Sequence, residues 1–246
     1  MVRAQCLQSA KDELASGLEE TTAQYQARLE LCDQLGGGPY DPSIVPAQFV
    51  SGISHPFFPH VVGTVRTYQK TTIEGTETVV VEVTDQTKTI LGVECMVIRD
   101  TVTLNGVLVE DTLDYFAQDV NGNVWYFGEL AINYENGEMV DLDGSFIAGT
   151  NGAKAGIVMK ASPAIGDTYR QEFFLNEAED AATILSLTGT AVVPFGTYQN
   201  CLVTLDFTPI SPEDEENKYY AQGIGVVLEI DLESGERLEL IDIVQR

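Results

Sequence analysis

The chain has 246 residues, with 38 acidic against 13 basic side chains, so its formal net charge at pH 7 is −25. This excess of negative charge repels phosphate backbones and anionic lipid surfaces, so nucleic acid is not an expected partner. Apolar residues make up 44% of the sequence, which is typical of a folded globular protein. A membrane span is not expected, because no stretch approaches the roughly 18 consecutive apolar residues that a membrane helix needs.

Residues 1–36 are predicted to be helical. Apolar side chains recur there at steps of three, four and seven residues, and three consecutive glycines, Gly36 to Gly38, end the segment. Ser16 and Glu19 have the spacing of a capping box, which starts a helix, so a break is expected near Ser16. The segment is therefore predicted to be an α-hairpin. The alternative is one rod, which would suit self-association through the N-terminal helices.

Four cysteines, an even number, predict two disulfides and a secreted location, either extracellular or periplasmic. They are Cys6, Cys32, Cys95 and Cys201. On one straight helix Cys6 and Cys32 would be about 40 Å apart, whereas a disulfide needs Cα atoms within about 7 Å. A folded-back helix would allow these two to pair, and a Cys6–Cys32 clamp is the favoured arrangement. The connectivity stays open, and four reduced thiols are the alternative.

Residues 37–60 are rich in glycine and proline, which disfavour regular helices and central strands, so a linker along the surface is predicted. Within it, His55 and His60 flank Pro56-Phe57-Phe58-Pro59. The two phenylalanines are expected to plug one end of the following domain, with the histidines near the surface.

Residues 61–246 form the third predicted segment. Short β-branched and aromatic runs alternate there with turn residues, a pattern typical of all-β proteins. The predicted fold class is mainly β, with an antiparallel β-barrel or a strongly curved sheet behind the N-terminal α-hairpin.

Two Asn-Gly pairs, Asn105-Gly106 and Asn121-Gly122, predict two-residue hairpin turns, because both central positions of such turns need positive φ. Turns this short would place Asp114 opposite Glu129 and Arg99 opposite Thr112. In the same register, Phe116 would face Phe127, and Gln118 would face Trp125. Side-chain alternation then gathers a candidate ligand-binding face. Its members are Arg99, Glu110, Asp114, Phe116, Gln118, Trp125, Phe127 and Glu129.

Two carboxylates directly opposed on a sheet repel each other unless something neutralises them. Arg99 is the favoured neutralising group, in an ion network with Asp114 and Glu129. A hard cation such as Ca²⁺ held by Asp114, Glu129 and Glu110 is a second hypothesis. A ligand pocket with aromatic walls is a third. Acid–base catalysis by the paired carboxylates is a fourth.

Three motifs resemble those of uncharacterised secreted bacterial β-proteins. They are the Pro-Phe-Phe-Pro segment, the block from Asp119 to Glu129, and Tyr220-Ala221 followed by Gly223-Ile224-Gly225-Val226-Val227. The closing pattern is also similar to half-barrel periplasmic lipoproteins that bind apolar ligands. The resemblance covers Phe49 to the C-terminus and implies a compartment and a fold, but no catalytic residues.

The predicted function is therefore a secreted binding module for a small or apolar ligand or a divalent cation, with no catalysis assumed. Two alternatives remain. One is an extracellular surface or filament-forming protein. The other is a carboxylate-dependent hydrolase or isomerase.

Overall fold

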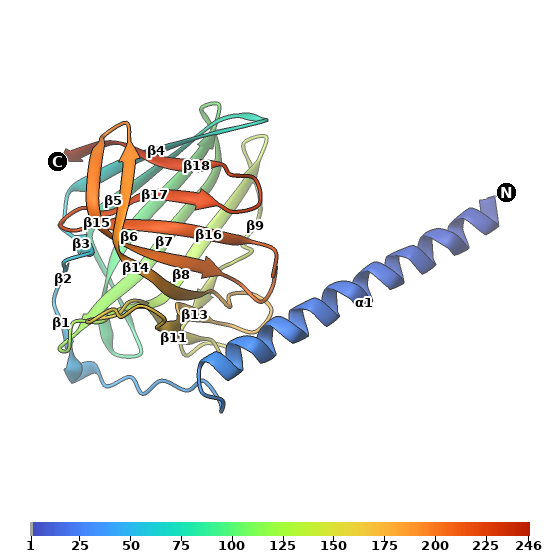
Figure 1. Ribbon diagram of the computed structural model, residues 1–246, viewed down its shortest axis with the longest axis horizontal. Helices are drawn as coiled ribbons and strands as arrows, with labels where there is room; N and C mark the ends of the chain where they lie inside the picture. Colours follow the sequence, from blue (N-terminus) through green and yellow to red (C-terminus); the bar gives the residue numbers. More distant parts are fainter. Residues whose placement is uncertain (1) are drawn as a thin grey trace.

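The structure is a computed structural model that describes residues 2–246. It contains a long N-terminal helix and an antiparallel sheet that curves into a nearly closed barrel (Figure 1). The predicted fold class is confirmed in its β part. Within residues 2–246, no helix combines the length and the apolar character needed to cross a membrane.

The main sheet follows the order β12-β14-β15-β16-β17-β18-β4-β5-β6-β7-β8-β11-β13, while β1, β9 and β10 pair at its side and β2 pairs with β3 separately. The strands are β1 (Phe49–Val50), β2 (Ile53–His55), β3 (Phe58–His60), β4 (Thr64–Thr72), β5 (Gly75–Ile90), β6 (Val93–Leu104), β7 (Val107–Asp119), β8 (Val124–Glu135), β9 (Glu138–Asp141), β10 (Phe146–Ile147), β11 (Lys154–Met159), β12 (Thr168–Arg170), β13 (Glu172–Phe173), β14 (Ala181–Val193), β15 (Gly196–Phe207), β16 (Glu215–Ala221), β17 (Gly225–Asp231) and β18 (Arg237–Gln245). A short 3-10 helix (Pro46–Gln48) precedes β1.

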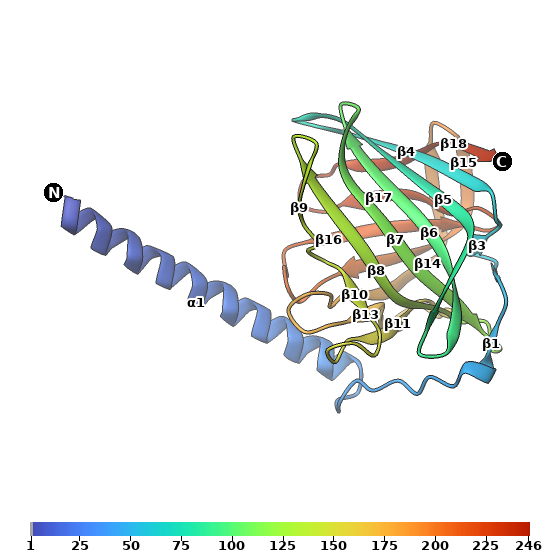
Figure 2. The same cartoon turned by 180° about the vertical axis from the view of Figure 1, so that it is seen from behind.

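Helix α1 (Val2–Gln34) is one continuous rod that projects away from the barrel (Figures 1 and 2). The predicted α-hairpin is wrong. Residues around the expected break stay helical, and the Thr21 hydroxyl donates to the carbonyl of Gly17 at 2.7 Å. A glycine inside a helix costs only about 1 kcal/mol, and the strong helix formers on both sides of Ser16-Gly17 outweigh it.

All four cysteines are free thiols, so the predicted disulfides are wrong. Cys6 and Cys32 lie on the same straight helix, which keeps them far apart. Cys95 and Cys201 belong to different apolar clusters, and burial raises the pKa of both thiols. The prediction of a secreted location therefore loses its support from disulfides.

The C-terminal part of α1 is fixed to the barrel. The Arg28 guanidinium binds the fully buried carboxylate of Glu179, with its Nη2 at 2.6 Å from Oε1, and Leu31 is buried. Nearer the N-terminus the apolar side chains are exposed, including Leu14 and Leu18 at 64% and 60%. The helix is thus anchored at one end only.

Candidate functional site inside the barrel

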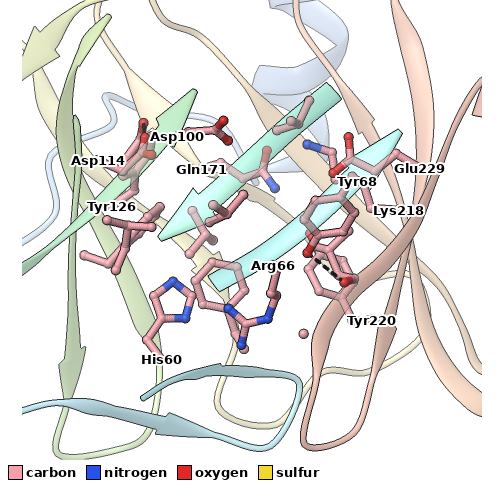
Figure 3. A pocket seen from close by; sticks show the side chains of 18 of the residues that line it. His60, Arg66, Tyr68, Asp100, Asp114, Tyr126, Gln171, Lys218, Tyr220 and Glu229 are labelled. Carbon is pink, nitrogen blue, oxygen red and sulfur yellow. Dashed lines mark hydrogen bonds between the residues drawn. The ribbon is translucent and has the colours of Figure 1, made fainter. Parts of the chain in front are cut away.

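A cavity of about 410 Å³ lies inside the barrel (Figure 3). Its apolar walls come mainly from strands β5, β6 and β17, and rings from β3, β4, β7, β8 and β16 complete them. Charged groups converge on this apolar space from several strands. They are Arg66, Asp100, Asp114, Glu172, Asp180, Lys218 and Glu229, with His60 beside them.

The first hairpin decides which charge of β6 faces the cavity. Its turn has the predicted two residues, and both Asn105 and Gly106 have positive φ. A bulge then follows, because Thr103 pairs with Leu108 whereas Val102 pairs with Glu110. The extra residue reverses the alternation of β6 relative to the prediction, as a bulge must.

Arg99 consequently pairs with Leu113, not Thr112, and lies on the outer face of the barrel. There its guanidinium binds Asp111, with Nε and Nη2 donating at 2.8 and 2.6 Å. The predicted network of Arg99 with Asp114 and Glu129 is therefore wrong. Asp100, its neighbour in sequence, faces the cavity instead.

The second hairpin has a longer loop than predicted. β7 ends at Asp119 and β8 begins at Val124, and Gln118 pairs with Val124 instead of Trp125. A second bulge corrects this offset: Phe116 pairs with Tyr126, Tyr115 with Gly128, and Asp114 with Glu129 as predicted.

Gly128 makes this bulge sterically feasible. Its φ is 142°, and a Cβ at this position would lie 2.3 Å from the carbonyl oxygen of Phe146. The bulge leaves Phe127 unpaired, so Tyr126 and Glu129 both lie on the same face as Asp114. This is how one strand presents a phenol and a carboxylate to the same neighbour.

Three other members of the predicted face are placed elsewhere. Phe127 is fully buried in a cluster on the outer face, beside Phe49, and Trp125 lies there too, with its indole donating to Asp119 at 2.9 Å. Gln118 accepts a hydrogen bond from the backbone of Ser54 at 2.8 Å and so contacts the β2–β3 hairpin. The predicted set therefore splits between the two sides of the barrel wall.

Of the predicted face, Asp114 and Glu129 stay together as Cα partners on the inner side of the wall. Asp100, which was not predicted, lines the cavity with Asp114, and these three carboxylates are called the acid cluster. Burial, followed by the charge of Asp114, raises the pKa of Asp100 well above its ordinary value. Burial also raises the pKa of Asp114 to about 7, against a lowering by the hydrogen bond that it accepts from Tyr126 at 2.5 Å. Burial and then Asp114 raise the pKa of Glu129 to about 8.

The acid cluster has no cation of its own. None of its three carboxylates takes part in a salt bridge among the described side chains. Glu110, the remaining predicted member, accepts a hydrogen bond from Thr112 at 2.6 Å and adds further negative charge that raises the pKa of Asp114.

Lys218 supplies the opposite side of the cavity with a cation that is well partnered (Figure 3). Its Nζ lies 2.8 Å from Glu216 and 3.7 Å from Asp206. Burial lowers its pKa, but the carboxylates, led by Glu216, more than offset this and hold the pKa well above its ordinary value. Asp206 also accepts from Gln171 at 2.9 Å. These groups, Lys218 with Glu216 and Asp206, are called the lysine cluster below.

The sequence did not predict Arg66 and His60 as site residues. Arg66 is 6% exposed, and its alternation with Tyr68 along β4 was the available signal that both face inward. His60 stacks on Phe58 at 4.6 Å between ring centroids, and its Nδ1 is buried with no hydrogen-bond partner among residues 2–246. Burial, then the charge of Arg66, lowers its pKa to about 3.

The histidines are therefore not near the surface as expected. The β2–β3 hairpin folds across one end of the barrel, with Phe58 against Phe116 at 5.5 Å, and His55 is 4% exposed. Phe57 and Phe58 both pack on an interior apolar cluster.

The hypothesis of a calcium site at Asp114, Glu129 and Glu110 gains no geometric support. In the described part of the chain, no group of three or more His, Cys, Asp and Glu side chains is arranged to hold a metal ion.

Known proteins give little guidance. No protein-family model matches the chain, and no curated protein matches it. Among solved structures, a candidate lipoprotein from Parabacteroides distasonis ATCC 8503 is similar, with a TM-score of 0.41 and 15% identity over 76% of this chain and 98% of that chain. A TM-score this low does not support a transfer of function to this chain.

Proposed function

We propose that the protein is a binding module that holds a small molecule inside its barrel. The observation that carries this proposal is the cavity of about 410 Å³, whose apolar walls surround a few converging polar groups. Ligand pockets of proteins are typically this large and have this composition. A predicted hydrolase or isomerase activity of the same carboxylates stays an untested alternative.

Polar atoms without protein partners support a ligand in this space. Oδ1 of Asp100 and Nδ1 of His60 are both buried and have no hydrogen-bond partner among the described side chains. Each such atom costs about 1 to 3 kcal/mol of stability. A barrel that served only as a scaffold would be more stable with apolar side chains at these positions, so they are better explained by a bound molecule.

A substitution that fills the cavity tests the proposed binding function. Val81 lines it, while its neighbour Val80 points to the other face of β5. Val81→Phe should abolish the thermal stabilisation given by hits from a screen of small charged and apolar molecules, and Val80→Phe should preserve it. Hits that stabilise the Val81→Phe variant as strongly as the wild type would contradict the proposal, as would a screen without hits.

We also propose, as a second function, self-association of two copies through α1. The exposed side chains of its outer part, Leu7, Leu14, Leu18 and Tyr25, follow one another at steps of seven, four and seven residues. This is the spacing of a coiled-coil seam, and the partner that matches such a seam best is a second copy of the same helix.

Sedimentation analysis tests this second proposal. Leu14→Glu places a charge in the seam and should dissociate the assembly to monomers, whereas Ser16→Glu adds the same charge on the opposite side of α1 and should not. A monomeric wild-type protein at micromolar concentration would contradict it.

A further inference from the structure

Two opposite charges flank one residue of the barrel wall without pairing. Arg66 and Asp100 are the Cα partners of Val81 on its two sides. Since neighbouring strands are about 4.8 Å apart, the two Cα atoms are about 10 Å apart. All three side chains line the cavity. A molecule lying over Val81 would therefore meet a cation on one side and a carboxylate on the other.

The guanidinium of Arg66 is turned away from Asp100. Its Nε donates to the carbonyl of Ile224 and its Nη2 to the carbonyl of Pro59, both at 2.9 Å. These neutral acceptors orient the group but do not compensate its charge, and no described side chain forms a salt bridge with it. Three of its five N–H donors remain for a ligand, and a planar carboxylate fits such a fork.

The acid cluster offers carboxylate oxygens that can accept hydrogen bonds from a cation. Within the described structure, Oδ1 of Asp100 has no hydrogen-bond partner, and Asp114 accepts one hydrogen bond, from Tyr126. Next to these carboxylates, the rings of Phe116 and Tyr126 are stacked at 4.6 Å between centroids and line the cavity. A protonated amine offers three donors and a positive charge, and ring faces attract such a cation. Figure 3 shows Asp100 and Asp114 together on one side, with Arg66 and His60 at the end of the cavity.

We infer that the ligand is a zwitterion with a protonated amine against Asp100 and Asp114 and a carboxylate against Arg66. This inference rests on the proposed binding function and names its ligand class. A ligand with a single charge would leave either Arg66 or the Asp100 and Asp114 carboxylates without an oppositely charged partner. Pairing at both ends offsets the cost of burying these protein charges, so we expect the doubly charged molecule to bind most tightly.

Calorimetric titration with linear ω-amino acids, from 4-aminobutanoate to 8-aminooctanoate, tests the inference. One length should bind best. The amine and the carboxylate of the same chain length, each lacking the other charged group, should bind at least about tenfold more weakly, because each loses a charged hydrogen-bond partner. The alcohol of the same chain length, which lacks both charged groups, should bind more weakly still.

Variants assign each end. Asp100→Asn should weaken binding of the amino acid and of the amine by about tenfold or more and leave the carboxylate unaffected. Arg66→Gln should weaken binding of the amino acid and of the carboxylate and leave the amine unaffected. If Arg66→Gln does not fold, Arg66→Lys replaces it. Because lysine keeps the charge but not the fork of donors, its loss of affinity should be intermediate. Asp111→Asn, which removes a carboxylate from the outer face of the same strand pair, is the matched control and should change nothing.

Two results would overturn the inference: binding of the alcohol as tight as that of the amino acid, or unchanged amino-acid binding by Asp100→Asn. If a hit from the screen is lost in Val81→Phe while either of these results holds, the binding function stands and only the ligand class is wrong. If no ω-amino acid binds, the inference is wrong, and the screen decides the binding function separately.

Discussion

The acid cluster and the lysine cluster differ in whether a cation lies among their carboxylates. In the lysine cluster, the ammonium of Lys218 lies between Glu216 and Asp206, and Gln171 satisfies a further oxygen. In the acid cluster, no cation among the described side chains lies between Asp100, Asp114 and Glu129. Burial raises the pKa of all three, as it does for Asp206 in the lysine cluster, so the absent cation is the difference. The comparison separates two uses of buried charge. The charge of the paired carboxylates is compensated by Lys218, whereas unpaired buried carboxylates destabilise the fold and need another reason to be present.

The largest expected effect comes from removing the bulge that builds the acid cluster. Gly128→Ala should lower the free energy of unfolding by about 3 kcal/mol or more, since it combines a strained φ with a clash against the backbone of Phe146. Urea denaturation measures this. Gly137→Ala is the control, because Gly137 also has positive φ, at 81°, but open space around it, and it should lose about 1 kcal/mol. Equal losses would show that the contact with Phe146 is unimportant.

Breaking the lysine cluster should have the next largest effect. Lys218→Met leaves Asp206 and Glu216 without their cation, and Asp206 is 5% exposed. Because an uncompensated buried charge is strongly destabilising, we expect a loss of about 2 to 4 kcal/mol in the free energy of unfolding at pH 7. A loss below about 1 kcal/mol in urea denaturation would contradict this, because it would show that Lys218 compensates little of the charge on Asp206 and Glu216.

Neutralising a carboxylate of the acid cluster should raise the free energy of unfolding. The pKa of Asp114 rises from its ordinary 3.8 to about 7 on folding, so between these values the folded protein binds more protons than the unfolded chain. Its stability contribution therefore falls as the pH rises through this window.

Asp114→Asn removes this dependence, since its amide does not ionise. Relative to the wild type it should gain little at pH 4 and about 1 to 3 kcal/mol at pH 8. Asp111→Asn serves as the control on the outer face. Thermal and urea denaturation of dialysed protein across this pH range give the difference, and a gain that does not grow with pH would show that Asp114 is already neutralised.

The smallest effect is expected for the ion pair outside the wall. Arg99 is 48% exposed at its side chain and binds Asp111 at 2.6 Å. Exposed pairs contribute about 0 to 1 kcal/mol, so Arg99→Gln should change the free energy of unfolding by less than about 1 kcal/mol and leave ligand affinity unchanged. A tenfold loss of affinity for the cavity ligand would show that Arg99 contributes to the binding site, as the sequence pattern predicted.

The part of the site that sequence patterns predicted is the part that local rules determine. Asn105-Gly106 forms its tight turn because both residues accept positive φ, and Asp114 pairs with Glu129. The bulge after Val102 has no comparable signal, and it sent Arg99 outward and Asp100 inward. The glycine at position 128, within a strand-like run, was a usable sign of the other bulge.

Long-range features could not be predicted in this way. Arg66 and Lys218 lie on strands separated by β17 and β18 in the sheet, and only closure of the barrel brings both into one cavity with Asp100. The choice between rod and hairpin for α1 likewise depends on the balance between the Ser16-Gly17 break and the helix formers around it, which spacing alone does not decide.

We conclude that no cation among the described side chains neutralises the acid cluster. Carbon-detected NMR titration of the side-chain carboxyls in dialysed protein tests it most directly, with Asp119, whose pKa is lowered despite burial by hydrogen bonds led by those from Asn123 and Trp125, as an internal contrast. We predict that Asp114 titrates with a pKa of about 7 and Glu129 with a pKa of about 8. Titration of both near pH 4 would contradict the account.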